Sequence, residues 1–385
     1  MTNPFVYGEV VPPAAFVNRV VELDRLIADL ASSQKIFLIS PRRYGKSSLI
    51  QRAMASMRKR GALTVDVTVS SFSSYVGFLE GYARALVSAE TRWDRARTWL
   101  REAVRSARAE VRYAPDPSLT TPGTGTLSVS FPGVRSDRDI SRLAQEVFAL
   151  PARLASERKK KIVIALDEFQ AVAGFNGGSV EHALRAAVQH QRDVGYVFAG
   201  SEPSLMEQML TPKRPFYKAG PVMRLEKIPA DEFAAFIEAR FADSGIRAEP
   251  GLGAAVVELA GNLPYDVQRL AHETWDDARA AGQKRANLDH LHATLNRLLS
   301  EQDTVFEALW QRLTLAQRGV LRAVVLQGGR ELLSADTRAR HRLGGPSSIQ
   351  SGLTALQKQD LVMKEGGRHV VIDSLFREWV ARRTF

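Results

Sequence analysis

Short apolar stretches alternate with segments of helical periodicity over roughly the first 225 residues of the chain. This alternation is the strongest constraint on the fold, because strands joined by helices pair as a parallel sheet whose two faces the helices cover. A long helical stretch is predicted at 75–112, and residues 115–133, rich in Pro, Gly, Ser and Thr, predict a surface loop or hairpin. We therefore expect an α/β fold. The predicted strands are 35–40, 63–69, 162–166, 196–199 and 222–225.

The strand signals end at Pro229, and the sequence beyond it predicts two smaller domains. From about residue 304, helical stretches precede two short strands around Gly366 and Gly367, which is the order of a winged helix-turn-helix. A chain of 385 residues has room for two or three domains. The predicted domains are an α/β core at 1–228, a helical lid at 229–303 and a winged helix at 304–385. Helices of the lid are predicted at 230–244, 252–260, 264–281 and 288–299.

Residues 40–47, Ser-Pro-Arg-Arg-Tyr-Gly-Lys-Ser, lie between a predicted buried strand and a predicted helix. They follow the phosphate-binding pattern G-x-x-x-x-G-K-[ST], except that Ser40 replaces its first glycine. In such a loop, backbone N–H groups surround phosphate oxygens, Lys46 reaches the terminal phosphates and the Ser47 hydroxyl is a Mg²⁺ ligand. Gly-Lys-Ser alone would indicate only an ordinary helix start. The residues predicted to bind the nucleotide here are Pro41, Arg42, Arg43, Tyr44, Gly45, Lys46, Ser47 and Ser48.

A second motif favours a nucleotide site over an ordinary helix start. The apolar strand at 162–166 is followed by Asp167 and Glu168, where one acid would organise the Mg²⁺ shell and the other polarise the attacking water. Ser201 follows the next strand and is predicted to meet the γ-phosphate or this water at the same sheet edge. Both acids can instead cap a helix, and Ser201 can be a helix N-cap. We predict Lys46, Asp167, Glu168 and Ser201 as catalytic residues, with Ser47 and Asp167 as the Mg²⁺ ligands.

Together these motifs resemble the prokaryotic P-loop ATPases called archaeal-type ATPases, close to the STAND and origin-initiator branches of the AAA+ superfamily. The resemblance implies ATP or ADP and Mg²⁺ as ligands of an ATPase core that is followed by a helical lid and a winged helix. It also implies that Phe16, Val17 and Arg19 pack by the adenine, with Asn18 replacing the usual glycine, and that Pro264 begins a lid helix closing over the nucleotide. The segments that carry the resemblance are 3–8, 16–23, 41–49, 166–170, 198–201, 261–265 and 373–379.

The relatives commonly complete their site from a neighbouring subunit, so the resemblance further implies a homo-oligomer that forms on ATP binding. An arginine finger from the neighbour would stabilise the charge on the γ-phosphate. No residue stands out for this role. The candidates are Arg192, Arg214, Lys218 and Arg224.

The charge of the chain favours contact with phosphate polymers, such as double-stranded DNA, or with other acidic surfaces. The net charge is +11, and residues 312–385, with thirteen Lys or Arg against six Asp or Glu, carry +7 of it. An arginine-rich surface can also be merely solvated, and a winged helix can dock a protein or pack on its own core. The second helix of the helix-turn-helix is predicted to follow an N-cap at Ser347. The predicted DNA contacts are Arg338, Arg340, Arg342, Ser348 and Lys358.

Our hypothesis is an ATP-binding and hydrolysing switch whose nucleotide state controls the engagement of DNA or a partner protein. The alternatives are a DNA-binding regulator with a weak nucleotide site, and a nucleotide-dependent signalling scaffold without DNA. The lack of cysteine excludes thiolate nucleophiles and Cys-ligated zinc, and the seven histidines are scattered. The apolar runs are too short for a membrane span and the first residues are not typical of a signal peptide, so we expect a cytoplasmic protein.

Overall fold

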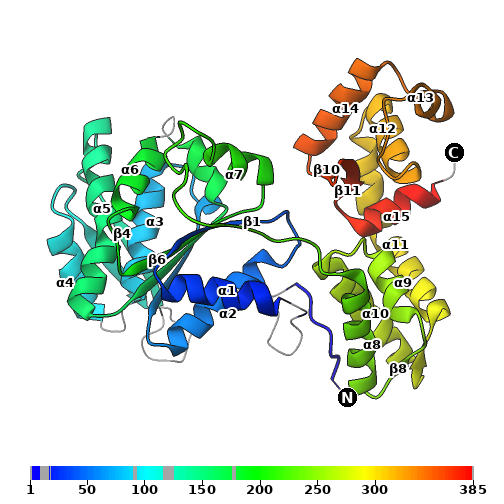
Figure 1. Cartoon of the computed structure of the whole chain (residues 1–385), viewed down its shortest axis with the longest axis horizontal. Helices are drawn as coiled ribbons and strands as arrows, with labels where there is room; N and C mark the ends of the chain where they lie inside the picture. The colour runs from blue at the N-terminus through cyan, green and yellow to red at the C-terminus, as the bar shows by residue number, and fades with distance from the viewer. Residues whose placement is uncertain are drawn as a thin grey trace. The chain divides into compact units, whose positions relative to one another are not determined.

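The computed structural model describes residues 2–8, 17, 19–89, 93–115, 125–175 and 179–383. The chain divides into two compact units, one formed by Arg19–Glu226 and the other by Met1–Asn18 together with Lys227–Phe385 (Figure 1). Each unit has a hydrophobic core of its own. Within the described ranges, every helix is too short or too polar to cross a lipid bilayer.

The Arg19–Glu226 unit is built on a five-stranded parallel sheet, which confirms the predicted α/β class. The strand order is β2-β5-β6-β1-β7, and all four pairings are parallel. The central strands are buried along almost their whole length, as expected for a sheet covered on both faces. Every predicted strand is present. The strands are β1 (Lys35–Ile39), β2 (Leu63–Thr68), β5 (Ile162–Asp167), β6 (Val194–Gly200) and β7 (Val222–Arg224).

Helices cover both faces of this sheet. In Figure 1, α1 and α2 lie on one face, and α3, α5 and α6 lie on the other. Two 3₁₀ helices, η2 (Val69–Ser71) and η3 (Phe169–Gly174), follow β2 and β5 directly. The α-helices are α1 (Val20–Ala31), α2 (Lys46–Lys59), α3 (Tyr75–Ser88), α4 (Trp93–Ala103), α5 (Asp137–Arg158), α6 (Ser179–Val188) and α7 (Pro203–Met209).

The long helical stretch predicted at 75–112 is helical over much of its length, but its end at 110–112 was wrongly predicted. The helical stretch divides into α3 and α4, and strand β3 (Glu110–Pro115) then pairs antiparallel with β4 (Gly125–Ser130). Val111 is buried while Arg112 is exposed, so side chains alternate here with the period of a strand. The hairpin predicted at 115–133 is confirmed by this pairing, and its residues 116–124 lie outside the described ranges.

The predicted lid helices are all present in the second unit. This unit also contains a pair of short parallel strands that was not predicted. They are β8 (Arg247–Ala248) and β9 (Arg285–Ala286). The N-terminal segment packs into the same core: Phe5 is 2% exposed, and its ring centroid lies 5.0 Å from that of Phe241. The helices are α8 (Ala230–Asp243), α9 (Leu252–Leu259), α10 (Pro264–Ala280) and α11 (Leu288–Gln311).

The C-terminal part of this unit has the order of a winged helix. Its hairpin turns at Gly366 and Gly367, as predicted, and both glycines have positive φ. The predicted N-cap is wrong, because α14 is capped by Gly345 and begins at Pro346 instead of following Ser347. Proline fits the first helical position, where its missing N–H costs no hydrogen bond. The elements are α12 (Leu315–Leu326), α13 (Ala335–His341), α14 (Pro346–Lys358), β10 (Val362–Glu365), β11 (Arg368–Val371) and α15 (Ser374–Arg382).

The long helix α11 joins the predicted lid to the predicted winged helix. It runs without interruption through residues 303 and 304, where the sequence predicts a domain boundary. Trp379 of α15 donates from its indole nitrogen to Asp303 Oδ1 at 2.7 Å, and Lys227 bonds both the Gly261 carbonyl and the Glu365 carboxylate. The division into three domains stays a prediction, whereas in the structure these two parts share one core.

Candidate nucleotide site

Gly45, in the loop between β1 and α2, has a backbone conformation that favours glycine. Gly45 has φ 87° and caps α2, which begins at Lys46. This left-handed conformation favours glycine because it lacks a Cβ. Ser40, in the place of the first glycine of the motif, is fully buried, and its hydroxyl donates to the Pro41 carbonyl at 3.0 Å. The loop therefore accommodates the serine side chain beneath it.

The predicted loop residues differ in their exposure. Arg43 also has a positive φ, 69°, in the middle of the loop. Lys46 is only 6% exposed although it carries a charge. Buried charges in proteins are paired, so Lys46 requires an anionic partner. Of the others, Arg42, Arg43 and Ser47 are exposed, Pro41, Gly45 and Ser48 are half-buried, and Tyr44 is buried.

That partner is the acidic pair at the end of β5. The Lys46 ammonium is in direct contact with the Asp167 carboxylate and lies 3.5 Å from Glu168 Oε1. The Ser47 hydroxyl donates to Asp167 Oδ2 at 3.4 Å. Strands β1 and β5 are separated in the sheet by β6, and their carboxyl ends lie at one sheet edge. The structure thus brings together the predicted lysine, serine and two acids.

Glu168 is the first residue after β5 and has a positive φ of 53°. Its N–H donates to Asp167 Oδ1 at 2.9 Å, which supports this turn of the backbone. The Ser201 hydroxyl donates to Glu168 Oε2 at 2.6 Å, so the serine predicted from the next strand also reaches the site. Burial of the carboxylate opposes its ionisation, but the hydrogen bonds from Ser201 and Gln170 and the charge of Lys46 outweigh burial and lower the pKa of Glu168.

One residue of the site escaped the sequence analysis. Gln170 donates from its amide to Glu168 Oε2 at 2.6 Å, from the beginning of η3. Gln170 ends the segment 166–170 that carries part of the family resemblance, but no role was assigned to its amide, which lies two residues after a pair of acids. That spacing becomes informative only when the positive φ of Glu168 turns the chain back on itself.

The oxygen atoms around Ser47 fit the predicted Mg²⁺ site. The Ser47 hydroxyl and the Asp167 carboxylate are hard oxygen donors that lie side by side, as Mg²⁺ requires of its ligands. Over the described part of the chain, no three or more His, Asp or Glu side chains form a metal-binding cluster. A Mg²⁺ ion held by two protein oxygens would take its other ligands from phosphate and water, as Mg²⁺ in nucleotide sites usually does.

The residues predicted to lie at the adenine are not part of this cluster. Phe16 lies outside the described residues, and Val17 and Pro264 belong to the other compact unit. Arg19 is buried, and its guanidinium bonds Glu22 at 2.7 Å as well as the Glu226 carbonyl. The predicted contacts of these residues with the nucleotide stay predictions.

Three candidates for an arginine finger make contacts within their own unit. Arg214 pairs at 2.5 Å with Glu181, which is 1% exposed, and Arg224 pairs at 3.1 Å with Glu207. The Lys218 ammonium lies 5.3 Å from the centroid of the Tyr217 ring. The Arg214 pair is structural, because it neutralises a buried carboxylate.

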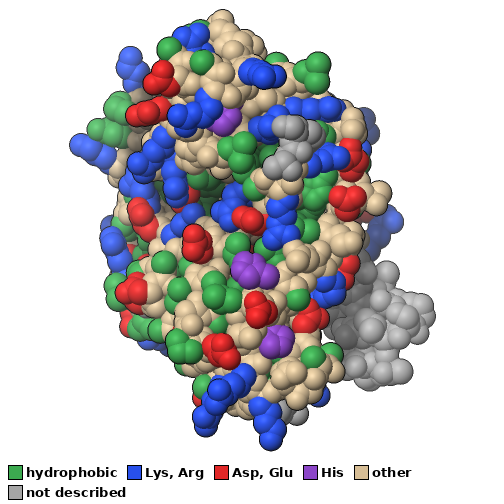
Figure 2. All heavy atoms as spheres, turned by 90° about the vertical axis from the view of Figure 1, so that its right-hand side faces the viewer, with side chains coloured by type: hydrophobic (Ala, Val, Ile, Leu, Met, Phe, Trp, Pro, Cys, Tyr) green, Lys and Arg blue, Asp and Glu red, His purple; other side chains and the backbone are tan. Residues whose placement is uncertain are grey.

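The residues predicted to contact DNA lie on two elements of the winged helix. Arg338 and Arg340 belong to α13, which Arg342 caps at its C-terminus, and Ser348 and Lys358 belong to α14. All are exposed except Arg338, which is half-buried. Figure 2 shows Lys and Arg side chains gathered over the upper part of the face that it presents.

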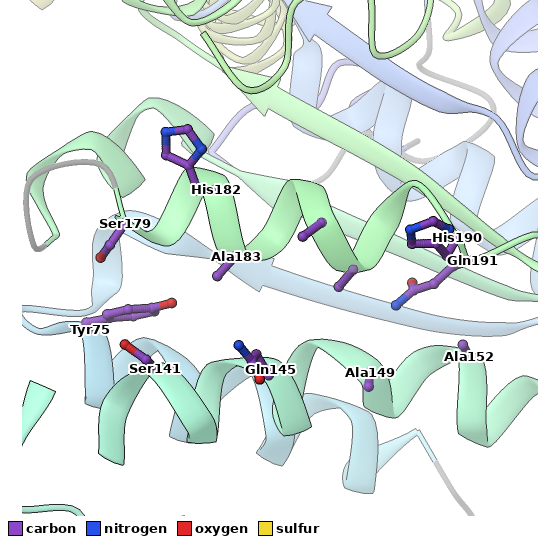
Figure 3. A pocket seen from close by; sticks show the side chains of 12 residues that line it. Tyr75, Ser141, Gln145, Ala149, Ala152, Ser179, His182, Ala183, His190 and Gln191 are labelled. Carbon is purple, nitrogen blue, oxygen red and sulfur yellow. The ribbon is translucent and has the colours of Figure 1, made fainter. Parts of the chain in front are cut away.

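A groove separate from these residues lies between α5 and α6, with a volume of about 840 Å³ (Figure 3). Alanine is the commonest residue in its lining, which also includes the polar side chains of Gln145, His182 and His190. None of the predicted site residues lines it. The candidate nucleotide site is therefore the cluster at the carboxyl edge of the sheet.

The parallel sheet, the loop after β1 and the acids at the end of β5 are the parts of a P-loop nucleotide-binding fold. Residues 16–270 match the family described as an ATPase domain predominantly from Archaea, and the chain belongs to this family. Residues 304–382 match a probable winged helix domain. The resemblance found in the sequence is thereby confirmed.

Solved structures are similar over nearly the whole chain. A Walker-type ATPase of Pyrococcus abyssi is 16% identical with a TM-score of 0.59, covering 97% of this chain and 99% of its own. The Aeropyrum pernix ORC2 protein in ADPNP–ADP complexes is 14% identical with a TM-score of 0.54, covering 97% and 94%. Drosophila ORC bound to DNA is 11% identical with a TM-score of 0.50, covering 98% and 89%. At these identities the likeness shows the fold alone. No protein with a curated description matches the sequence.

Proposed function

We propose that this protein binds Mg²⁺ and ATP, hydrolyses ATP to ADP and phosphate, and acts as a nucleotide-dependent switch. The observation that carries the proposal is the convergence of Lys46, Ser47, Asp167, Glu168 and Ser201 at one sheet edge. Each of these side chains is of the type that phosphoryl transfer requires, and the acids follow a buried strand. Family membership supports the same conclusion.

The chemistry assigned to each side chain follows from its contacts. Lys46 would leave Asp167 for the terminal phosphates, which offer a stronger anionic partner. Ser47 and Asp167 would hold Mg²⁺, which when bound neutralises phosphate charge. Glu168 would accept a proton from the attacking water, and its lowered pKa keeps it ionised at neutral pH. The Ser201 hydroxyl would donate to Glu168 in the absence of nucleotide. After rotation of its side chain it would donate to the γ-phosphate or to the attacking water.

Single-turnover and steady-state ATP hydrolysis test these roles. Glu168→Gln should keep its affinity for ATP, because its amide oxygen can still accept from Ser201 and Gln170, and should lose about 100-fold or more in kcat. Lys46→Ala should lose both affinity, by about tenfold or more, and turnover. Lys59→Ala, an exposed lysine at the far end of the same helix, is the matched control and should behave as wild type.

Three outcomes would contradict the proposal. Equal turnover in wild type and Glu168→Gln at saturating ATP would reject the role of Glu168. Tight ATP binding without turnover by the wild type would instead favour the nucleotide-dependent scaffold, and weak ATP binding would favour a DNA-binding regulator.

We further propose that the nucleotide state controls engagement of double-stranded DNA, with a protein partner as the alternative. The exposed arginines of α13 and the winged-helix match support DNA, and a similar fold occurs in an ORC described as bound to DNA. ATP turnover measured with and without duplex DNA, together with the mass in solution, tests this. If duplex DNA at low salt changes neither the ATP turnover nor the mass in solution, a protein partner is favoured.

We also propose that ATP binding promotes a homo-oligomer. The pairing of Arg214 and Arg224 with acids of their own unit counts against either as the finger, and leaves Arg192 and Lys218 as the candidates that a neighbouring subunit would supply. The expected location of the protein in the cytoplasm stays a prediction.

A further inference from the structure

Gln170 is a buried amide between two carboxylates. Its side chain is at the beginning of η3, and the residue is 6% exposed. The amide nitrogen donates to Glu168 Oε2 at 2.6 Å and to Glu202 Oε1 at 3.3 Å. The amide oxygen is buried and has no hydrogen-bond partner among the described residues. Only the nitrogen can face two carboxylates, so these contacts determine the orientation of the amide.

The packing around Gln170 leaves this side chain little freedom. A Cβ added at Gly200 would lie 2.7 Å from Gln170 Oε1 and 2.4 Å from Met206 Cγ. Only glycine at the end of β6 therefore leaves room for the amide. A buried polar group with one unsatisfied atom lowers stability, and such groups gather where function requires them.

The two hydrogen bonds to Glu168 act on one oxygen. Ser201 and Gln170 both donate to Oε2 at 2.6 Å. The other oxygen, Oε1, then faces Lys46 at 3.5 Å. When Lys46 pairs with phosphate, Oε1 becomes the oxygen that is available to accept a proton from water.

We infer that Gln170 is a positioning residue for Glu168, which together with Ser201 fixes one carboxylate oxygen so that the other faces the reacting groups. The inference deepens the proposed ATP hydrolysis and rests on it for the role of Glu168. The contacts of Gln170 with the carboxylate are independent of that role.

The two hydrogen bonds also determine how freely the Glu168 carboxylate can turn. With donors from Ser201 and Gln170 on Oε2, the orientation of Oε1 toward Lys46 is fixed. Without the Gln170 donor, only Ser201 holds Oε2, and the carboxylate can rotate away from the reacting groups.

Two variants separate the hydrogen bond from the packing. Gln170→Met keeps the length of the side chain and removes the donor. Gln170→Glu keeps the shape and replaces the donor by a carboxylate, which repels Glu168 instead of holding it. Glu202→Gln is the matched control, because it changes the other carboxylate bonded to Gln170 and leaves the bond to Glu168.

The first measurement does not depend on hydrolysis. Crystal structures of the nucleotide-free variants show the orientation of the Glu168 carboxylate. We expect this orientation to change in both Gln170 variants and to stay as in the wild type in Glu202→Gln. An unchanged carboxylate in Gln170→Met overturns the inference, whether or not the protein hydrolyses ATP.

The second measurement separates ATP turnover from ATP affinity. We expect about a tenfold or larger fall in kcat for both Gln170 variants with the affinity for ATP unchanged, because the carboxylate that accepts the proton is no longer held in place. A loss of ATP affinity as large as the loss of kcat indicates general disruption and overturns the positioning role. A wild type without turnover, combined with the expected change of the carboxylate, would reject the proposed hydrolysis and retain the contact of Gln170 with Glu168.

Discussion

Phe5→Ala should destabilise the unit formed by Met1–Asn18 and Lys227–Phe385 and leave the other unit unchanged. Phe5 is 2% exposed and contacts Phe241, which is fully buried. Removing a buried phenylalanine side chain costs about 3–5 kcal/mol, depending on how far the site collapses. The bonds from Asn3 to the His272 carbonyl and from Tyr7 to Glu273 hold the segment on both sides of the cavity. We expect a loss near the lower end of this range, about 3 kcal/mol, because the short N-terminal segment can detach and so avoid leaving a cavity.

The expected change is large enough for calorimetry. For a unit of this size, 1 kcal/mol corresponds to about 2–4 °C, so the transition of this unit should move down by about 6–12 °C. Because each unit has its own core, two transitions are expected, and the one that ATP raises belongs to Arg19–Glu226. Val21→Ala, at an exposed position of α1, is the control and should change stability by less than about 0.5 kcal/mol. An unchanged transition of the unit that contains Phe5, or a shift of the transition that ATP raises, would refute the reasoning.

Three further predictions concern DNA, assembly and pH. Replacing Arg338, Arg340 and Arg342 by alanine should weaken duplex binding and reduce the slope of log K against log salt by about one for each lost phosphate contact, and an unchanged slope would count against DNA contact there. By sedimentation, Glu168→Gln in ATP should form a larger assembly than in ADP, and wild-type specific activity should rise with concentration, whereas a strict monomer with constant activity would reject a site completed by a neighbour. Burial opposes the ionisation of Glu273, but the hydrogen bonds from Arg297 and Tyr7 outweigh burial and lower the pKa of this carboxyl. The ionised Glu273 therefore stabilises the folded protein above the ordinary pKa of 4.5, and this contribution is lost as the pH falls through the lowered pKa. In urea denaturation at pH 7, Arg297→Met should therefore lower the free energy of unfolding by about 1 kcal/mol, a modest amount because the guanidinium is partly exposed. The difference from wild type should shrink in acid, and a difference independent of pH would contradict an origin in the ionised Glu273.

The parts of the site that are predictable from sequence are those in which one short segment determines both structure and chemistry. The loop at 40–47 and the acids at 167–168 each follow an apolar strand, and parallel strands bring their carboxyl ends to one edge. Lys46, Asp167 and Ser201 could therefore be brought together before any coordinates were available. The winged helix was predictable for a similar reason, since its hairpin has a local signal at Gly366 and Gly367.

The features that escaped prediction depend on contacts that a local pattern does not encode. Gln170 reaches Glu168 only because the backbone at Glu168 adopts a positive φ. Phe5 reaches Phe241 across more than two hundred residues, and the sequence around Phe5 has no periodicity that indicates a buried face. The strand at 110–115 was hidden by the helical pattern before it, although Val111 and Arg112 already alternate. The predicted break at residue 304 fails to interrupt α11, because Phe306 and Trp310 continue its buried face.

Arg19 and Glu226 are the first and last residues of the nucleotide-binding unit, and the guanidinium of one is bonded to the carbonyl of the other. The polypeptide thus enters and leaves this unit at a single point, as in a domain inserted into a host loop. A gene segment encoding residues 19–226 could be excised and expressed as one continuous piece, and a short linker could rejoin the chain on its two sides. The helical and winged-helix unit, although discontinuous in sequence, would then become a single uninterrupted chain.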